Sequence, residues 1–238
     1  MAYTYGEGEG KKGGNNVSSL LHKHLHDDGI FAHVNQTGKA CNELTLVFDN
    51  CAGQNKNRMV LRYAQYLCDA GIFHKVEVVF LICGHTKNIC DRRFKDLKKL
   101  YHYSNIFSMS TLVNVLSTTD TQMTKKNKWV RVEEIKADSF FDWDTWLSKF
   151  YSLTVPGYSK FHLFLHYESM RPLQCRVVAG QMEDETKVDL HKKVFSILST
   201  EIAKNNWKHN LKLGNPEPIE RVGLNKRKQV ELWENGER

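Results

Sequence analysis

Two short apolar segments that flank one amphipathic segment narrow the folds open to this chain more than any other feature. The apolar segments are residues 43–49 (ELTLVFD) and 75–84 (KVEVVFLICG), and both are typical of buried β-strands. Between them, residues 57–71 repeat apolar side chains at the spacing of an α-helix and end on Gly71. A helix that connects two buried strands is a crossover between parallel neighbours. The sequence therefore predicts that these two strands are adjacent and parallel, with the first of them internal to the sheet.

Helical patterns also precede and follow these strands. Residues 13–29 place apolar side chains on one helical face and end on Gly29. Residues 88–102 repeat apolar side chains at the same spacing. The predicted order of helix, strand, helix, strand and helix indicates an α/β fold.

The character of the sequence changes near Ser117, where a polar linker begins. A strand, a helix that Asp142 could cap, and two further strands are predicted beyond the linker. The aromatic side chains of that helix share one face, which indicates core packing: Trp143, Trp146, Phe150 and Tyr151. We therefore expect an α/β core at 1–116, a small α+β appendage at 117–180, and a helix with a basic, loosely ordered tail at 181–238.

Two carboxylates occupy the positions where open α/β sheets bind ligands. Asp49 ends the first strand, and Asp91 falls in the first turn of the helix that follows the second strand. Enzymes of the ribonuclease H-like fold that cut or join polynucleotides hold Mg²⁺ with carboxylates in this order. Two or three carboxylates suffice for Mg²⁺ when a substrate phosphate completes its shell. The pattern predicts a Mg²⁺ or Mn²⁺ site at Asp49 and Asp91, although a strand-end Asp followed by Asn is also typical of a turn or helix cap.

Amide and basic side chains accompany both carboxylates. Those that follow Asp49 are expected to contact the phosphate backbone of DNA or to orient Asp49: Asn50, Gln54, Asn55, Lys56, Asn57 and Arg58. His85 is expected to position a backbone group or the substrate beside Asp91. A basic group on the third helix either lines a phosphate backbone or forms an exposed helix face: Arg92, Arg93, Lys95, Lys98 and Lys99. The formal net charge of +7 permits a polyanionic partner such as DNA.

These residues fall within longer motifs that resemble those of an uncharacterised eukaryotic family of transposase-like domains, related to DDE transposases and retroviral-type integrases. The first motif, DNCAGQNKN, spans residues 49–57, and the second combines Gly-His-Thr at 84–86 with Cys-Asp-Arg-x-Phe at 90–94. A weaker third motif comprises Tyr5, Glu7, Gly13 and Gly14. The resemblance covers roughly residues 3–180. It implies a ribonuclease H-like domain in which Asp49 and Asp91 are the second and third acidic positions of a Mg²⁺-dependent nuclease or strand-transfer site.

The sequence departs from the family's pattern at two points. The family's first acidic residue lies on a strand upstream of the Tyr5–Glu7 motif, so the resemblance implies a core that lacks its first strands in these 238 residues. Glu7 is the candidate for a substitute metal ligand, and Lys95 stands where the family has Gly. Because a two-ion site needs a further carboxylate, we expect little nuclease activity from this chain and Mg²⁺-dependent activity from an N-terminally extended form.

Two other functions stay open at this point. One is a non-catalytic nucleic-acid-binding module derived from a transposable element, which keeps the fold and the basic helix. The other is a zinc-stabilised structural or interaction domain that uses cysteine and histidine ligands: Cys51, Cys83, His85 and Cys90. The paired cysteine spacings typical of zinc modules are missing from the sequence.

The composition bears on location. No run of about 18 apolar residues occurs, and the first residues form no apolar signal core, so we expect no membrane partner. Six cysteines in a chain of 238 residues are too sparse for a disulfide scaffold and favour reduced thiols. The sequence therefore predicts an intracellular protein, with the nucleus as one candidate location.

Overall fold

The computed structural model describes residues 1–82, 89–122, 131–151, 157–167, 173–177, 186–188 and 216–219. Within these ranges only the backbone is described at 89–93, 118–122 and 186–188. The chain divides into two compact units, which we call the sheet unit and the helix-pair unit. The sheet unit comprises Lys12–Thr86 and Phe141–Pro218, and the helix-pair unit comprises Met1–Lys11, Lys87–Phe140 and Ile219–Arg238.

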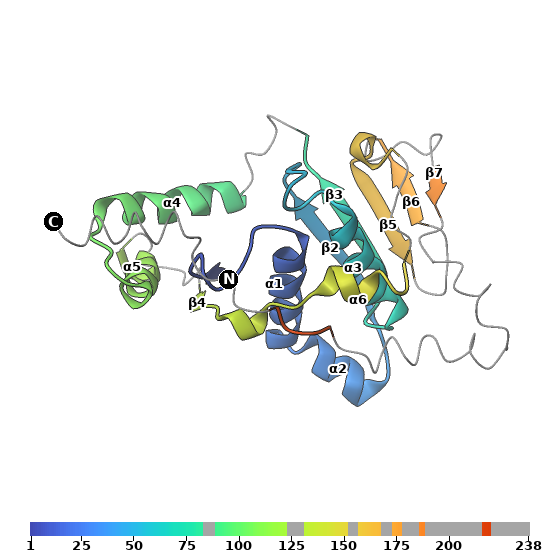
Figure 1. Cartoon of the computed structure of the whole chain (residues 1–238), viewed down its shortest axis with the longest axis horizontal. Coiled ribbons are helices and arrows are strands. Elements are labelled where there is room, and N and C mark those ends of the chain that lie inside the picture. The colour runs from blue at the N-terminus through green and yellow to red at the C-terminus, as the bar shows by residue number, and fades with distance from the viewer. Residues whose placement is uncertain are drawn as a thin grey trace. The chain divides into compact units, whose positions relative to one another are not determined.

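The sheet unit holds a mixed sheet, one helix that packs on it and further helices that pack on that helix or on one another (Figure 1). Its helices are α1 (Gly14–Asp27), α2 (Ile30–Thr37), α3 (Arg58–Asp69), α6 (Trp143–Leu147) and the 3₁₀ turn η2 (Tyr158–Lys160). Its strands are β2 (Cys41–Phe48), β3 (Phe73–Phe80), β5 (Leu163–Tyr167), β6 (Leu173–Arg176) and β7 (Thr186–Val188). The order in the sheet is β2-β3-β5-β6-β7.

The pairing of β2 with β3 confirms the predicted parallel neighbours. Cys41 lies opposite Phe73 and Phe48 lies opposite Phe80, with α3 as the crossover between the strands. The remaining pairs are antiparallel: β3 with β5, β5 with β6, and β6 with β7. The α/β class predicted from the sequence is therefore confirmed. Strands β5 and β6, which the sequence analysis placed in an appendage, pair into the same sheet as β2 and β3.

The prediction that β2 is an internal strand is wrong for the described part of the sheet, where β2 lies at one edge. Leu46 is buried, but Val47 is 54% exposed and Phe48 is only partly buried. Strand β3, with neighbours on both sides, buries Val76, Val78 and Phe80 almost completely. Val47 alternates with Leu46 along the strand, so the two side chains point to opposite faces of the sheet, and the face that carries Val47 is the exposed one.

Helix α3 joins the sheet to the other helices of the sheet unit. It packs against the strands β3 and β5 and against the helices α1 and α6. Its side chains Tyr63, Ala64 and Leu67 are at most 1% exposed. The helix ends at Asp69, and Gly71, two residues later, has a φ of 71° in the left-handed region that glycine adopts without strain.

The start of α3 is fixed by a side-chain cap. The Asn57 Oδ1 atom accepts hydrogen bonds from the backbone nitrogens of Met59 (2.9 Å) and Val60 (3.1 Å), which have no partner within the helix. Helix α1 begins against this cap, because a Cβ at Gly14 would lie 2.7 Å from Asn57 Oδ1 and 2.7 Å from Met59 Cβ. Glycine at position 14 therefore lets the starts of the two helices meet.

An aromatic cluster joins α1, α3 and α6, and it confirms the predicted packing role of the aromatic face of α6. The Trp143 ring lies 4.9 Å from the rings of His22 and Tyr63, and 5.9 Å from the ring of Trp146. Trp143 is 1% exposed, and its indole nitrogen donates a hydrogen bond to the Ser19 hydroxyl (3.1 Å). The predicted cap is also confirmed, since Asp142 accepts a hydrogen bond from the Thr145 backbone (3.2 Å).

The helix-pair unit contains α4 (Ile89–Tyr103), α5 (Met109–Gln122), the 3₁₀ turn η1 (Ala137–Ser139) and the strands β1 (Ala2–Thr4) and β4 (Val132–Glu134). Helices α4 and α5 pack together, with Leu97 and Leu116 buried. Strands β1 and β4 form a parallel pair beside α5. No helix in the described part of the chain is long and apolar enough to span a bilayer.

The first testable prediction concerns His22. Burial, with a smaller contribution from His26, lowers the pKa of His22 from 6.5 to about 4, and its Nδ1 atom lies 2.9 Å from the Tyr63 hydroxyl. The folded state binds this proton less tightly than the unfolded state. The contribution of neutral His22 to the free energy of unfolding is therefore fully present above pH 6.5 and is lost as the pH falls toward 4. Between pH 6.5 and 4, we expect His22 to lower the free energy of unfolding measured with urea by a value on the order of 2 kcal/mol. His22→Gln should remove this pH dependence, whereas His33→Gln, at an exposed position on α2, should leave it unchanged.

The second prediction concerns Gly14. Alanine is intrinsically better than glycine in a helix by up to about 1 kcal/mol, but its Cβ would overlap Asn57 and Met59. We expect the overlap to prevail and Gly14→Ala to lower the free energy of unfolding by about 1–3 kcal/mol. The matched control is Gly53→Ala, since a Cβ there meets nothing within 4 Å. Equal stabilities of the two variants would contradict the close approach of α1 to α3.

Candidate metal and nucleic-acid site

The candidate site begins at the carboxyl end of the parallel strand pair. Asp49 directly follows β2 and is exposed to solvent. Phe48 and Phe80 are register partners at the ends of β2 and β3, and the backbone nitrogen of Leu81 donates to the Phe48 carbonyl (2.9 Å). The chain therefore leaves both strands at the same edge of the sheet, which is where open α/β sheets bind ligands.

Backbone hydrogen bonds to the Cys51 carbonyl stabilise the loop that carries Asp49. This oxygen accepts hydrogen bonds from the backbone nitrogens of Gln54 (3.3 Å), Asn55 (2.9 Å) and Lys56 (2.9 Å). The Asn55 amide then donates a hydrogen bond to Asp49 Oδ1. The amides after Asp49 were expected either to contact the DNA backbone or to orient Asp49. The contact of Asn55 corresponds to the second role. No described residue donates to the second carboxylate oxygen of Asp49.

Lys56 lies inside the fold. Its side chain is 3% exposed, its Nζ atom donates a hydrogen bond to the Ser159 carbonyl (2.9 Å), and the ammonium lies 5.5 Å from the centre of the Phe80 ring. The lysine therefore ties the loop to the segment before β5, and the structure does not place it on a surface that nucleic acid reaches. Asn57, also predicted to bind nucleic acid, has its side chain engaged in the cap of α3 and in a bond to the Gln54 carbonyl (2.8 Å).

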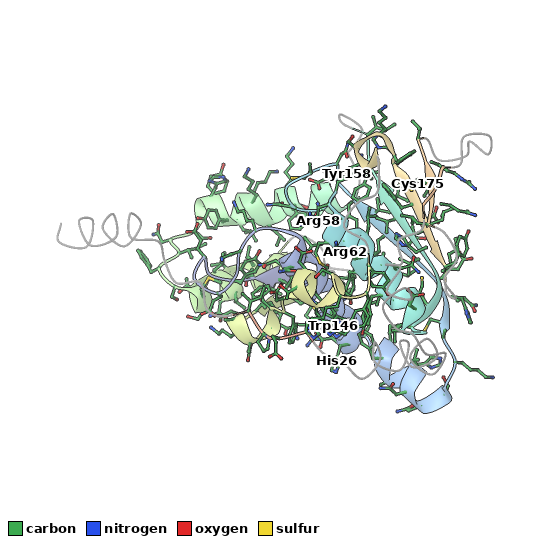
Figure 2. All side chains as sticks on the ribbon, turned by 45° about the vertical axis from the view of Figure 1, so that its right-hand side comes forward. His26, Arg58, Arg62, Trp146, Tyr158 and Cys175 are labelled. Atoms are coloured by element: carbon green, nitrogen blue, oxygen red, sulfur yellow. The ribbon has the colours of Figure 1, made fainter. Side chains whose placement is uncertain are left out.

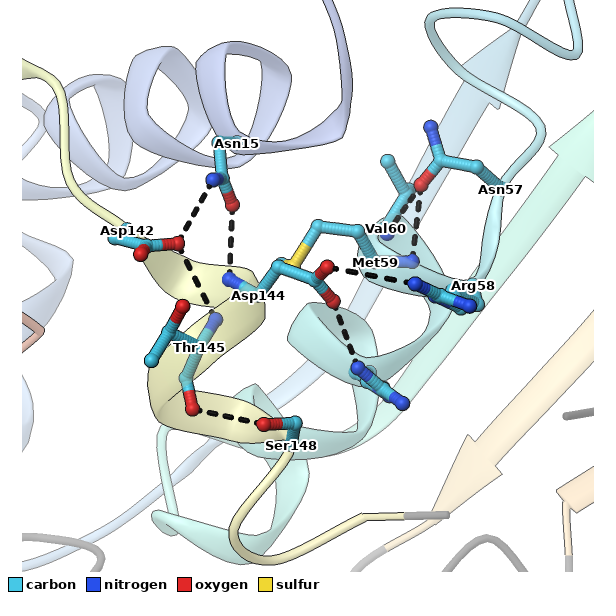
Figure 3. A network of polar contacts seen from close by, with 10 residues as sticks. Asn15, Asn57, Arg58, Met59, Val60, Asp142, Asp144, Thr145 and Ser148 are labelled. Atoms are coloured by element: carbon cyan, nitrogen blue, oxygen red, sulfur yellow. Dashed lines mark hydrogen bonds and ion pairs between the residues drawn. The ribbon is translucent and has the colours of Figure 1, made fainter. Parts of the chain in front are cut away.

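Arg58 and Arg62 lie one turn apart on α3 and share one carboxylate (Figures 2 and 3). Arg62 donates to Asp144 Oδ1 (2.8 Å), and Arg58 lies 3.6 Å from Asp144 Oδ2. The Arg62 side chain is 1% exposed, whereas that of Arg58 is 55% exposed. Burial lowers the pKa of Arg62, and Asp144 opposes this shift. Arg58 is thus the one exposed cation among residues 49–58.

The same network ties α1 to α6 (Figure 3). The Asn15 side chain donates to Asp142 Oδ1 (3.0 Å) and accepts a hydrogen bond from the Asp144 backbone nitrogen (2.9 Å). The sequence analysis missed Asn15, Arg62 and Asp144. An arginine within the apolar face of a predicted helix was the available signal for Arg62, because such a buried charge requires an acidic partner.

The other predicted residues divide between the two units. Asp49 and its loop belong to the sheet unit, whereas Asp91 and Glu7 belong to the helix-pair unit. Asp91, Arg92 and Arg93 fall in the first turns of α4, but their side chains lie outside the described residues, as does all of His85. Lys95 is exposed on α4, and Glu7 is exposed in the segment after β1.

The metal site stays a prediction, with Asp49 and Asp91 as its expected ligands. No group of three or more His, Cys, Asp or Glu side chains within the described ranges is placed to hold a metal ion. Two carboxylates fit a hydrated Mg²⁺ or Mn²⁺ whose shell is completed by water and phosphate oxygens. Of the predicted zinc ligands, Cys51 is an exposed free thiol, and the side chains of Cys83, His85 and Cys90 lie outside the described part of the chain.

Comparison with known proteins identifies the family to which the chain belongs. No curated protein and no solved structure matches the chain. A family model described as "Domain of unknown function (DUF7869)" matches residues 16–178, a range that includes both Asp49 and Asp91. Because this match covers more than half of the 238 residues, the chain belongs to the DUF7869 family.

Proposed function

We propose that this chain is a ribonuclease H-like domain of transposase or integrase origin, which contributes part of a site for Mg²⁺-dependent phosphodiester hydrolysis or strand transfer on DNA. The observation that carries the proposal is the solvent-exposed carboxylate of Asp49 at the carboxyl end of a parallel β2–α3–β3 crossover. Helix α4, with Asp91 in its first turn, comes next along the chain. This order of strand, Asp, helix, strand and helix with Asp is the one that the motifs at 49–57 and 84–94 imply.

Each residue has a separate task in this proposal. Asp49 and Asp91 would hold one Mg²⁺ or Mn²⁺, and Glu7 is the candidate third carboxylate. When bound, the ion would polarise a phosphate oxygen and lower the pKa of an attacking water. Asn55 fixes the rotamer of Asp49 through the bond to Oδ1. Arg58, 55% exposed beside this loop, would neutralise a phosphate of the DNA backbone.

A non-catalytic nucleic-acid-binding module is the second candidate, and one observation favours it. Lys95, Lys98 and Lys99 are all exposed on α4, so the basic surface does not depend on the carboxylates. Such a module would bind DNA in a salt-dependent manner and would have no need of a divalent ion. Metal binding therefore separates the two candidates.

The third prediction is that Asp49→Asn and Asp91→Asn each weaken Mn²⁺ binding, measured by electron paramagnetic resonance of free Mn²⁺. Loss of a residue that merely supports a ligand costs about 10–100-fold in metal affinity, so loss of a ligand should cost at least tenfold. The matched control is Glu43→Gln, which removes a 61% exposed carboxylate from the opposite end of the same strand and should leave the affinity unchanged.

Two results would count against the proposal. One is Mn²⁺ affinity that is equal in the wild type, Asp49→Asn and Asp91→Asn, which would favour the non-catalytic module. The other comes from supercoiled plasmid, where any Mg²⁺-dependent nicking by the chain has to disappear with Asp49→Asn. Nicking that survives this substitution would remove Asp49 from the site.

A further inference from the structure

Helix α4 and the segment after it carry aromatic side chains in solvent. Phe94 is 64% exposed and Tyr101 is 53% exposed, and Tyr103 and Phe107 are both 90% exposed. Helix α4 packs against α5 (Figure 1). Phe94 and Tyr101 continue the apolar spacing of α4, yet Leu97 is the one buried side chain among those described on α4. Large apolar side chains gathered on one exposed surface mark a place where a partner binds.

The aromatic rings alternate with cations along the helix. Phe94, Lys98 and Tyr101 follow one another at i, i+4 and i+7, so that each lies next to the following one on the helix surface. The rise of the helix separates the two rings by about 10 Å along its axis. Exposed Lys95, Lys99 and His102 lie beside this row, and Asp96 is the one acidic residue among the described side chains of α4.

This combination matches the chemistry of an unpaired nucleic-acid strand. Single-stranded nucleic acids are bound by aromatic side chains on which bases stack and by cations that follow the phosphates. The bases of a duplex already stack on one another, so a duplex would engage the lysines and leave the rings unused. A second copy of this chain is disfavoured as the occupant, because two surfaces of this kind would bring like charges together.

We propose that the exposed face of α4, defined by Phe94, Lys95, Lys98, Lys99 and Tyr101, binds single-stranded DNA through base stacking on Phe94 and Tyr101. The choice of DNA rests on the proposed function, in which unpaired DNA arises at cleaved or distorted ends. The face belongs to the helix-pair unit and requires no metal ion.

The test is fluorescence anisotropy of a labelled 20-nucleotide oligo-dT strand with the full chain, in EDTA, beside a duplex of equal length. The variant Phe94→Ala/Tyr101→Ala should bind the single strand at least about fivefold more weakly, the lower end of the effect for one lost stack. Its affinity for the duplex should stay within roughly twofold of the wild type, because the lysines remain. Thermal unfolding by circular dichroism verifies that the variant folds.

Matched variants separate stacking from other effects. Phe94→Tyr/Tyr101→Phe keeps both rings and should retain single-strand affinity. Tyr158→Ala removes a 38% exposed ring from the sheet unit (Figure 2) and should also retain it. Lys98→Gln should reduce the salt dependence of single-strand binding by a slope of about 0.7, the value for one lost phosphate contact.

Several results would overturn the inference. They are an unchanged single-strand affinity in Phe94→Ala/Tyr101→Ala, an equal loss on single strand and duplex, and tighter binding of an oligo-U strand than of oligo-dT. A concentration-dependent dimer that the same variant abolishes, seen by sedimentation, would reassign the face to a second copy. The anisotropy is measured in EDTA and the metal site is tested by Mn²⁺ binding, so this inference and the proposed metal site fail independently.

Discussion

The structure depends on the few residues that join β2 to α3. Asn57 caps α3 and meets Gly14 at the start of α1, so one side chain sets the position of both helices. Lys56, the residue before the cap, reaches into the fold and bonds to the Ser159 carbonyl ahead of β5. The loop that carries Asp49 is therefore attached to α1, α3 and the sheet at once. The proposed ligand of Asp49 would therefore meet a carboxylate whose loop is already held by these contacts.

Local patterns sufficed for part of this arrangement. The apolar periods of the two first strands and of the helix between them predicted the parallel pair, because a crossover connection leaves few other topologies. The aromatic face of α6 and its Asp142 cap also followed from spacing alone, since both depend on residues within two turns of one another. The approach of Gly14 to Asn57, in contrast, joins residues 43 positions apart and leaves no local signal.

Other features depend on which distant parts of the chain pack against a segment, and the sequence of the segment itself does not specify these partners. The antiparallel pairing of β5 with β3 joins residues 84 to 92 positions apart, and no local pattern specifies that partner. The motif alone indicates a solvated cation at Lys56. In the structure the side chain is buried, because its ammonium lies over the Phe80 ring and donates a hydrogen bond to the Ser159 carbonyl. Phe94 and Tyr101 have the spacing of a buried face, yet they are exposed. The helical period predicts which side chains share a face, but it does not predict whether another element packs on that face.

The central claim is that Asp49 and Asp91 hold one divalent ion. Paramagnetic broadening by Mn²⁺ in the amide spectrum of the ¹⁵N-labelled chain tests it most directly, because broadening falls off steeply with distance from the bound ion. The account predicts that the signals of Asp49, Asn50 and Asp91 broaden together at the lowest Mn²⁺ concentrations, while that of Glu43 at the start of β2 stays sharp. Broadening of Asp49 and Asp91 at different concentrations, or broadening that spares Asp49, would contradict the account.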